Sequence, residues 1–279
     1  MYAGVMGVKS ILEVLTQVFD RHEPVTLNFS NCHFISAEGI ALIAGMKLLR
    51  DSKGFLTEID VNSIEHRVKL LLSRSQLLGL FGCEPYPLRV GNTLPIYTQS
   101  ELCKDGILYY IDNEVLRRTQ MPEMSEDLLK EVRRAFFEVF GNIFCHSQSP
   151  IGGLVCGQVY PNSKEIQIVF YDIGVGIAGR IREVQRSINS DTEAIEWALR
   201  RGTSTLSNSG ESRGLGLSLL RQFLFVNGGI LNIYANKGAV AEIKSKRICS
   251  ILPRNLRGTL IDMRIMIRND VKYVFSYEE

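Results

Sequence analysis

Three polar residues stand one helical turn apart in the middle of the chain. Glu138, Asn142 and His146 are spaced i, i+4 and i+8, which places them on one face of a helix. Their neighbours are largely apolar, so polar groups in this helix need partners or a chemical role. A carboxylate and a carboxamide one turn apart can activate water and bind a hard cation through oxygen. A polar stripe facing solvent is the alternative interpretation.

A second candidate is Asp172, which opens the segment Asp-Ile-Gly-Val-Gly directly after an apolar run. We expect its carboxylate at the end of a strand, where Gly174 and Gly176 let a ligand approach the backbone closely. A tight turn after a strand would also account for the glycines. A dinucleotide-binding fingerprint is excluded, because the third glycine is Gly179 and no acidic residue stands at the expected distance on a second strand.

The third candidate is a glycine-rich segment, residues 210–217, which runs into an apolar helix at residues 218–225. Free N–H groups and the positive end of the helix dipole form an anion site at such a helix start. The segment lacks the Gly-Lys-Ser/Thr ending of a P-loop, so a nucleotide would be held differently. A flexible loop that caps a helix is the alternative.

Together, the patterns Glu-x-x-x-Asn-x-x-x-His, Asp-x-Gly-x-Gly and Gly-Leu-Gly-Leu resemble the GHKL ATPase superfamily, which includes gyrase, Hsp90, MutL, histidine kinases and anti-sigma-factor kinases. The segments Asn-Gly-Gly-Ile-Leu from Asn227 and Arg-Gly-Thr-Leu from Arg257 agree with that resemblance. It covers residues 108–267 and implies a Bergerat fold, a two-layer α/β sandwich with a mixed sheet.

The resemblance also implies roles for single residues. Glu138 corresponds to the general base that orients the attacking water or hydroxyl, and Asn142 to the ligand of a Mg²⁺ ion that bridges the triphosphate of ATP. Asp172 corresponds to the carboxylate that reads adenine. The full set of implied ATP-binding residues is Asn142, His146, Asp172, Gly174, Gly176, Arg213, Gly214, Leu215, Gly216 and Thr259.

Within that set, Gly176 lets the base approach, Gly214 and Gly216 contact phosphates, and Thr259 supports the adenine end. Residues 202–213 correspond to the ATP lid. His146 could equally be a structural cap at the end of its helix, and Arg213 is assigned to the phosphates from its charge alone.

The first third of the chain resembles a STAS domain of the anti-anti-sigma type over residues 8–81, with the pattern concentrated in Val25–Gly39. Ala37 and Glu38 stand where that family has its phospho-acceptor serine pair, and Ser36 stands where it has an aspartate. Phosphorylation at the usual position is therefore not expected, and Glu38 would supply a permanent negative charge instead. A generic α/β interaction domain is the alternative.

The predicted organisation has three parts: a STAS-like interaction domain at residues 1–90, a Pro- and Gly-rich linker at 91–106 and an ATP-binding domain at 107–279. The fold class is α/β, a small STAS-like α/β domain followed by the sandwich. Periodicity predicts a long helix at Ser125–Phe144 capped by Ser125, a hairpin of strands at 154–160 and 165–171, and a short strand at 107–111.

Composition limits the function classes. The chain has 279 residues, and 32 Lys and Arg against 30 Asp and Glu give a net charge of +2, so we expect no nucleic-acid or polybasic membrane binding. Six scattered cysteines without a C-x-x-C motif favour reduced thiols over a zinc site or disulfide framework. No apolar run reaches the ~20 residues of a membrane span, and no secretory signal is recognised. The expected location is the cytoplasm.

The sequence therefore predicts a Mg²⁺-dependent ATP-binding and hydrolysing switch that signals its nucleotide state to a protein partner through the STAS-like domain. A serine/threonine protein kinase of the anti-sigma-factor type is the first alternative, and a non-catalytic nucleotide-sensing module is the second. Homodimerisation is possible by analogy with relatives.

Overall fold

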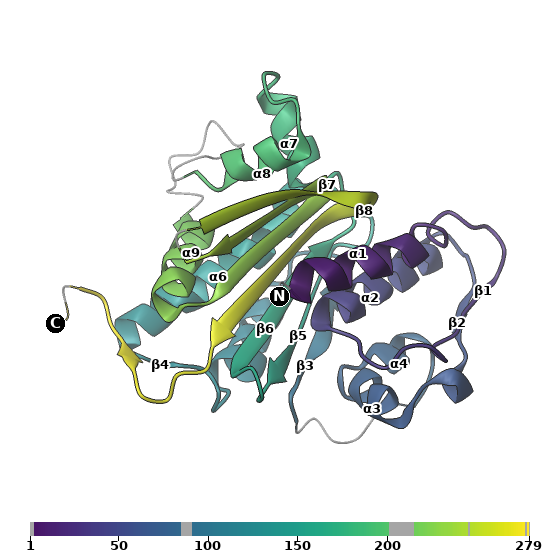
Figure 1. Cartoon of the computed structure of the whole chain (residues 1–279), viewed down its shortest axis with the longest axis horizontal. Coiled ribbons are helices and arrows are strands. Elements are labelled where there is room, and N and C mark those ends of the chain that lie inside the picture. The colour runs from purple at the N-terminus through teal and green to yellow at the C-terminus, as the bar shows by residue number, and fades with distance from the viewer. Residues whose placement is uncertain (1–2, 85–90, 201–214, 245, 277, 279) are drawn as a thin grey trace.

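A five-stranded antiparallel sheet forms the centre of the computed structural model, which describes residues 3–84, 91–200, 215–244, 246–276 and 278 (Figure 1). Its strand order is β3 (Thr93–Gln99), β5 (Gly153–Tyr160), β6 (Glu165–Asp172), β8 (Lys246–Met266) and β7 (Ile230–Ile243). Two short parallel pairs lie apart from it: β1 (Val25–Leu27) with β2 (Thr57–Ile59), and β4 (Glu123–Met124) with β9 (Lys272–Tyr273). The α/β class is confirmed, while the expected mixed main sheet is antiparallel throughout.

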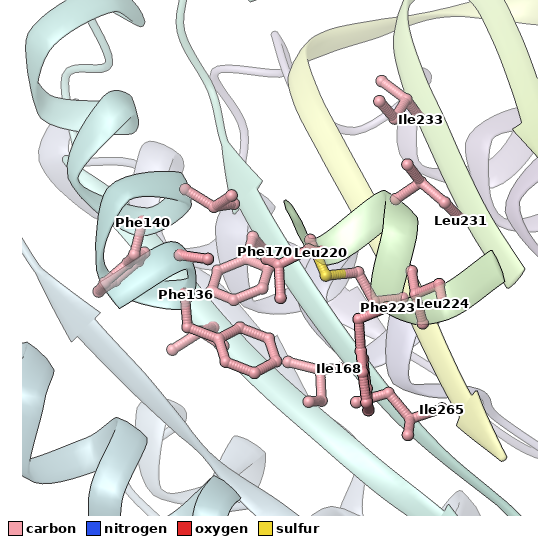
Figure 2. Close-up of a cluster of buried hydrophobic side chains, with 14 of the residues drawn as sticks. Phe136, Phe140, Ile168, Phe170, Leu220, Phe223, Leu224, Leu231, Ile233 and Ile265 are labelled. Atoms are coloured by element: carbon pink, nitrogen blue, oxygen red, sulfur yellow. The ribbon is translucent and has the colours of Figure 1, made fainter. Parts of the chain in front are cut away.

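Two helices cover one face of this sheet, α6 (Glu126–His146) and α9 (Leu215–Asn227). The side chain of Ser125 accepts a hydrogen bond from the Leu128 N–H, which confirms the predicted cap. Figure 2 shows Phe136 and Phe140 of α6 directed at Phe170 of β6, and the ring centroids lie 6.2 and 6.0 Å from that of Phe170. Aromatic burial of this kind fixes α6 on the sheet.

The opposite face is covered by the N-terminal helices α1 (Ala3–Leu15) and α2 (Ala37–Ser52) (Figure 1). A Cβ atom at Gly45 would lie 2.5 Å from Cε1 of Tyr171, so glycine lets α2 approach the sheet closely. Buried residues of both helices share one hydrophobic cluster with Val169, Tyr171 and Leu260 of the sheet. Helices on both faces explain why the central strands are almost continuously apolar. The predicted boundary at residue 90 stays a prediction.

The rest of the N-terminal segment consists of short elements beside this layer. They are a 3₁₀ turn (Val61–Ser63), α3 (His66–Arg74) and α4 (Leu77–Leu80). Two further helices, α7 (Gly176–Val184) and α8 (Asp191–Ala198), lie at the end of the sheet beyond β6 and β7 (Figure 1).

Two local predictions need correction. Residues 107–111 are helical instead of a strand, because α5 (Lys104–Tyr110) continues as a π-helical turn over Ile111–Leu116. The buried side chains of Ile107, Tyr110 and Ile111 recur at helical spacing and form one core-facing stripe. The segment predicted as a linker, residues 91–106, contains β3, which pairs with β5 at the edge of the sheet. Among the described residues, every helix is too short or too polar to cross a bilayer.

Candidate functional site

Glu138 on α6 touches the first turn of α9. Its Oε2 accepts a hydrogen bond of 3.0 Å from the backbone N–H of Gly216, 78 residues away in sequence. A Cβ atom at position 216 would lie 2.8 Å from that oxygen and 2.9 Å from Cβ of Glu138, so only glycine fits there without a shift. The first and third motifs therefore meet, and the start of α9 binds an anionic oxygen as a helix N-terminus favours.

Asn142 follows Glu138 one turn later on α6 and is exposed to solvent. His146 is the last residue of α6, and its side chain lies outside what the structure describes. Among the described residues, no group of three or more His, Cys, Asp or Glu side chains could hold a metal ion. A cation here would depend on a single amide oxygen together with ligands that a substrate supplies, which is an arrangement that Mg²⁺ accepts.

Asp172 is the last residue of β6, and its side chain is 4% exposed. Because side chains alternate along a strand, Asp172 shares a face with Ile168 and Phe170, which pack in the α6 cluster, while Tyr171 points to the α2 side. The carboxylates of Asp172 and Glu138 thus belong to the same side of the sheet.

Neutral groups surround the Asp172 carboxylate. The N–H of Gly174 donates to Oδ1 at 2.8 Å, and Thr259, its register partner on β8, also donates to it. Burial raises the pKa of Asp172 to about 7, although the hydrogen bonds from Gly174 and Thr259 act to lower it. The Thr259 Oγ1 also accepts from the Ile177 N–H at 2.8 Å, so one hydroxyl links β8 to the start of α7.

The glycines after Asp172 are also required by the packing of the turn, because side chains at these positions would overlap neighbouring backbone. A Cβ atom at Gly174 would overlap the carbonyl oxygen of Ser147, the residue that follows α6, and the Val175 N–H donates to that oxygen at 2.8 Å. Gly176 has a left-handed backbone with φ 73°, and a Cβ atom there would lie 2.7 Å from the carbonyl oxygen of Gly258. This loop is therefore a tight turn that also ties the end of α6 to Asp172.

Part of the predicted site falls outside the described residues. Arg213, Gly214 and the segment 202–213 lie outside the described residues, and Leu215 opens α9 with a side chain that is not described. The structure brings Glu138 to Gly216 and brings Asp172 to Gly174 and Thr259.

Sequence reasoning missed Asn236, and it used Gly258 only as part of the Arg-Gly-Thr-Leu segment, without a role in the site. Asn236 lies in β7 with a left-handed φ of 52°, and its Oδ1 is buried without a hydrogen-bond partner in the described part of the chain. That oxygen is 2.8 Å from where a Cβ atom of Gly176 would be. Asparagine is one of the few residue types that tolerate a left-handed backbone, so Asn followed by Lys-Gly inside a strand could have marked this position.

A second buried polar cluster lies on the α2 face. Glu38 is fully buried, and the guanidinium of Arg264 donates to its Oε1 at 3.0 Å and to Asp262 Oδ2 at 3.3 Å. Burial and the charge of Glu38 raise the pKa of Asp262. Glu38, which the STAS-like pattern expects to supply a permanent negative charge, is enclosed in this internal ion pair and is not presented at the surface.

Comparison of the sequence with protein-family models and with curated proteins gave no match. The chemistry of the site is therefore argued from its residues. It combines the half-buried carboxylate of Glu138, which contacts the start of α9, with the exposed amide of Asn142 one turn away on α6. The third group is the buried carboxylate of Asp172, which lies among glycines at the end of a strand. These groups could respectively position a nucleophile, hold a cation and accept a hydrogen bond from a ligand.

Proposed function

We propose that this chain is a Mg²⁺-dependent ATP-binding and ATP-hydrolysing regulatory protein of the GHKL type. The observation that carries the proposal is the contact of Glu138 with the Gly216 N–H, which joins the acidic motif of α6 to the glycine motif of α9. Asp172 and its glycines on the same side of the sheet supply a second, base-reading end.

In this proposal the phosphates of ATP lie at the start of α9. The 13-residue helix begins next to Gly216, whose N–H already binds a carboxylate oxygen. Terminal N–H groups and the helix dipole stabilise a phosphate in the same way. Glu138 stands beside these groups and would orient a water molecule for attack and accept its proton.

Asn142 would contribute one amide oxygen to Mg²⁺. The residue is exposed and lies one turn from Glu138, and Mg²⁺ usually takes only one or two protein ligands when phosphates bind it too. When bound, the ion would neutralise phosphate charge.

Asp172 would accept a hydrogen bond from the amino group of adenine. Its ionised form is an acceptor only, and the neutral groups around it leave that carboxylate without a cation of its own among the described residues. The N-terminal helices share a core with the strand that ends at Asp172, which offers a route by which a nucleotide could influence them and a protein partner.

The test replaces Glu138 by glutamine, whose amide oxygen can still accept from the Gly216 N–H. Hydrolysis of ATP should fall at least about 100-fold while ATP affinity stays within about threefold, because the general base is lost and the binding groups remain. The matched control is Glu131→Gln, two turns earlier on α6, where the carboxylate pairs with the nearby Arg134 at the surface.

Unchanged turnover in Glu138→Gln would remove this residue from the reaction. Labelled ATP distinguishes the alternative activity: release of free phosphate supports hydrolysis, and label on a protein indicates a kinase. Absence of any heat of binding with ATP and Mg²⁺ would reject all nucleotide functions.

A further inference from the structure

The strand β7 changes direction at Asn236. The register with β8 shifts on both sides of this residue, and its backbone is left-handed. The corner is held from outside, because the Lys237 N–H donates to Asp191 Oδ2 at 3.0 Å and a Cβ atom at Gly238 would lie 2.7 Å from the Asp191 carbonyl carbon. The backbone on the C-terminal side of Asn236 is thus held by the start of α8.

The Asn236 Oδ1 and the Asp172 carboxylate flank the same pair of glycines. The amide oxygen lies against Gly176, and Gly176 lies against the carbonyl of Gly258. A Cβ atom at Gly258 would in turn be 2.7 Å from Asp172 Oδ1. Two acceptor side chains from different strands therefore border two glycines that touch each other, Gly176 at the start of α7 and Gly258 in β8.

A purely conformational role explains only part of this arrangement. The left-handed corner requires a residue that tolerates positive φ, and glycine would satisfy that requirement at lower strain. It does not require an amide oxygen that is buried and has no hydrogen-bond partner among the described residues. A buried acceptor without a partner costs free energy, which a ligand donor would recover.

We propose that Asn236 Oδ1 accepts one N–H of the adenine 6-amino group while Asp172 accepts the other, so that the pair selects adenine over guanine nucleotides. The inference rests on the proposed function and adds the basis of base selectivity to it. The 6-amino group carries two donors, which match two acceptors. Guanine has a carbonyl oxygen at the same position, and that oxygen would face two acceptors and find no donor.

The experiment measures binding of diphosphates by calorimetry, because ADP and its analogues are not consumed. The variant is Asn236→Gly, in which glycine keeps the left-handed corner and only the amide is removed. ADP should bind about tenfold more weakly to this variant than to the wild type. Purine riboside diphosphate, which carries hydrogen in place of the 6-amino group, should bind equally to both.

An equal loss for both ligands, or no loss for ADP, would overturn the assignment of Asn236. A second measurement needs no variant: the wild type should bind N6-methyl-ADP, which retains one donor, about tenfold more weakly than ADP, and equal affinity would also overturn the assignment. These failures differ from failure of the proposed function, in which the wild type would bind none of the nucleotides.

Discussion

Asp172 and Asp262 are buried carboxylates on neighbouring strands of one sheet, and their surroundings differ in kind. Asp262 receives donors on both oxygens, from Gln167 at 2.9 Å, Asn232 at 2.7 Å and Arg264 at 3.3 Å. Within the described part of the chain, Asp172 receives hydrogen bonds from the Gly174 N–H and from Thr259. The buried charge of Asp262 is balanced by an arginine within the fold. The carboxylate of Asp172 has only neutral donors and glycines near it in the described structure, so a ligand can change its interactions.

The two positions also lie on opposite faces of the sheet. In the β6–β8 pairing Asp172 is opposite Thr259, and Asp262 is opposite Val169, three pairs away. Asp262 faces the α2 layer, where Arg264 also donates to Glu38. Asp172 faces the α6 side, where the neighbouring turns consist largely of glycines and carry few side chains. The comparison indicates that one acidic cluster holds the layers together and the other forms the candidate site.

The largest effect is expected from Arg264→Met, which leaves Glu38 and Asp262 buried without their cation. We expect the free energy of unfolding to fall by about 3–5 kcal/mol at pH 8, and by less at pH 5, where Asp262 can bind a proton. Urea unfolding measures the loss. Arg268→Met, which breaks an exposed pair with Asp270, is the control and should leave the free energy of unfolding nearly unchanged, because solvent screens that pair. A similarly small loss for Arg264→Met would show that the cluster is not structural.

Asp172→Asn should have the opposite sign. The pKa of about 7 against an ordinary 3.8 means that the native state pays to ionise this group as the pH rises from about 4 to 7. Removing the charge should therefore stabilise the protein by up to about 4 kcal/mol at pH 8 and have almost no effect at pH 4.

The comparison predicts no such gain for Asp262→Asn, because its new amide would face the donors of Gln167, Asn232 and Arg264. Thermal unfolding of both variants across this pH range tests the difference. If both gained stability alike, the distinction between the two carboxylates would fail. In the proposed function, Asp172→Asn also weakens ADP binding by about tenfold or more.

The smallest effect concerns the pH dependence of ADP affinity in the wild type. If ADP binds the ionised form of Asp172, then at a pH below its pKa of about 7 this carboxyl group must also lose its proton when ADP binds. Affinity should then fall about tenfold between pH 8 and pH 6. Calorimetry at both values measures it, and the same titration with Asp172→Asn corrects for protonation of the phosphates. An identical profile in the variant would contradict the role of Asp172.

The sequence by itself determined the local structure and the chemical inventory of this protein. The capped helix α6, the β5–β6 hairpin and the glycine turn after Asp172 follow from periodicity, capping and turn residues within a few positions of each other. It also placed Glu138 and Asn142 on one helix face, because helical spacing is a local property.

Only the tertiary structure decided which faces and strands meet. The antiparallel order of the sheet, the α2 layer against it and the pairing of Glu38 with Arg264, 226 residues apart, depend on contacts between distant segments. The same holds for Asn236 beside Gly176: Asn-Lys-Gly can mark a corner within a strand, but the contact of its side chain with Gly176 depends on where β7 meets α8 and α7. Periodicity is local, and burial between layers is a property of the whole chain.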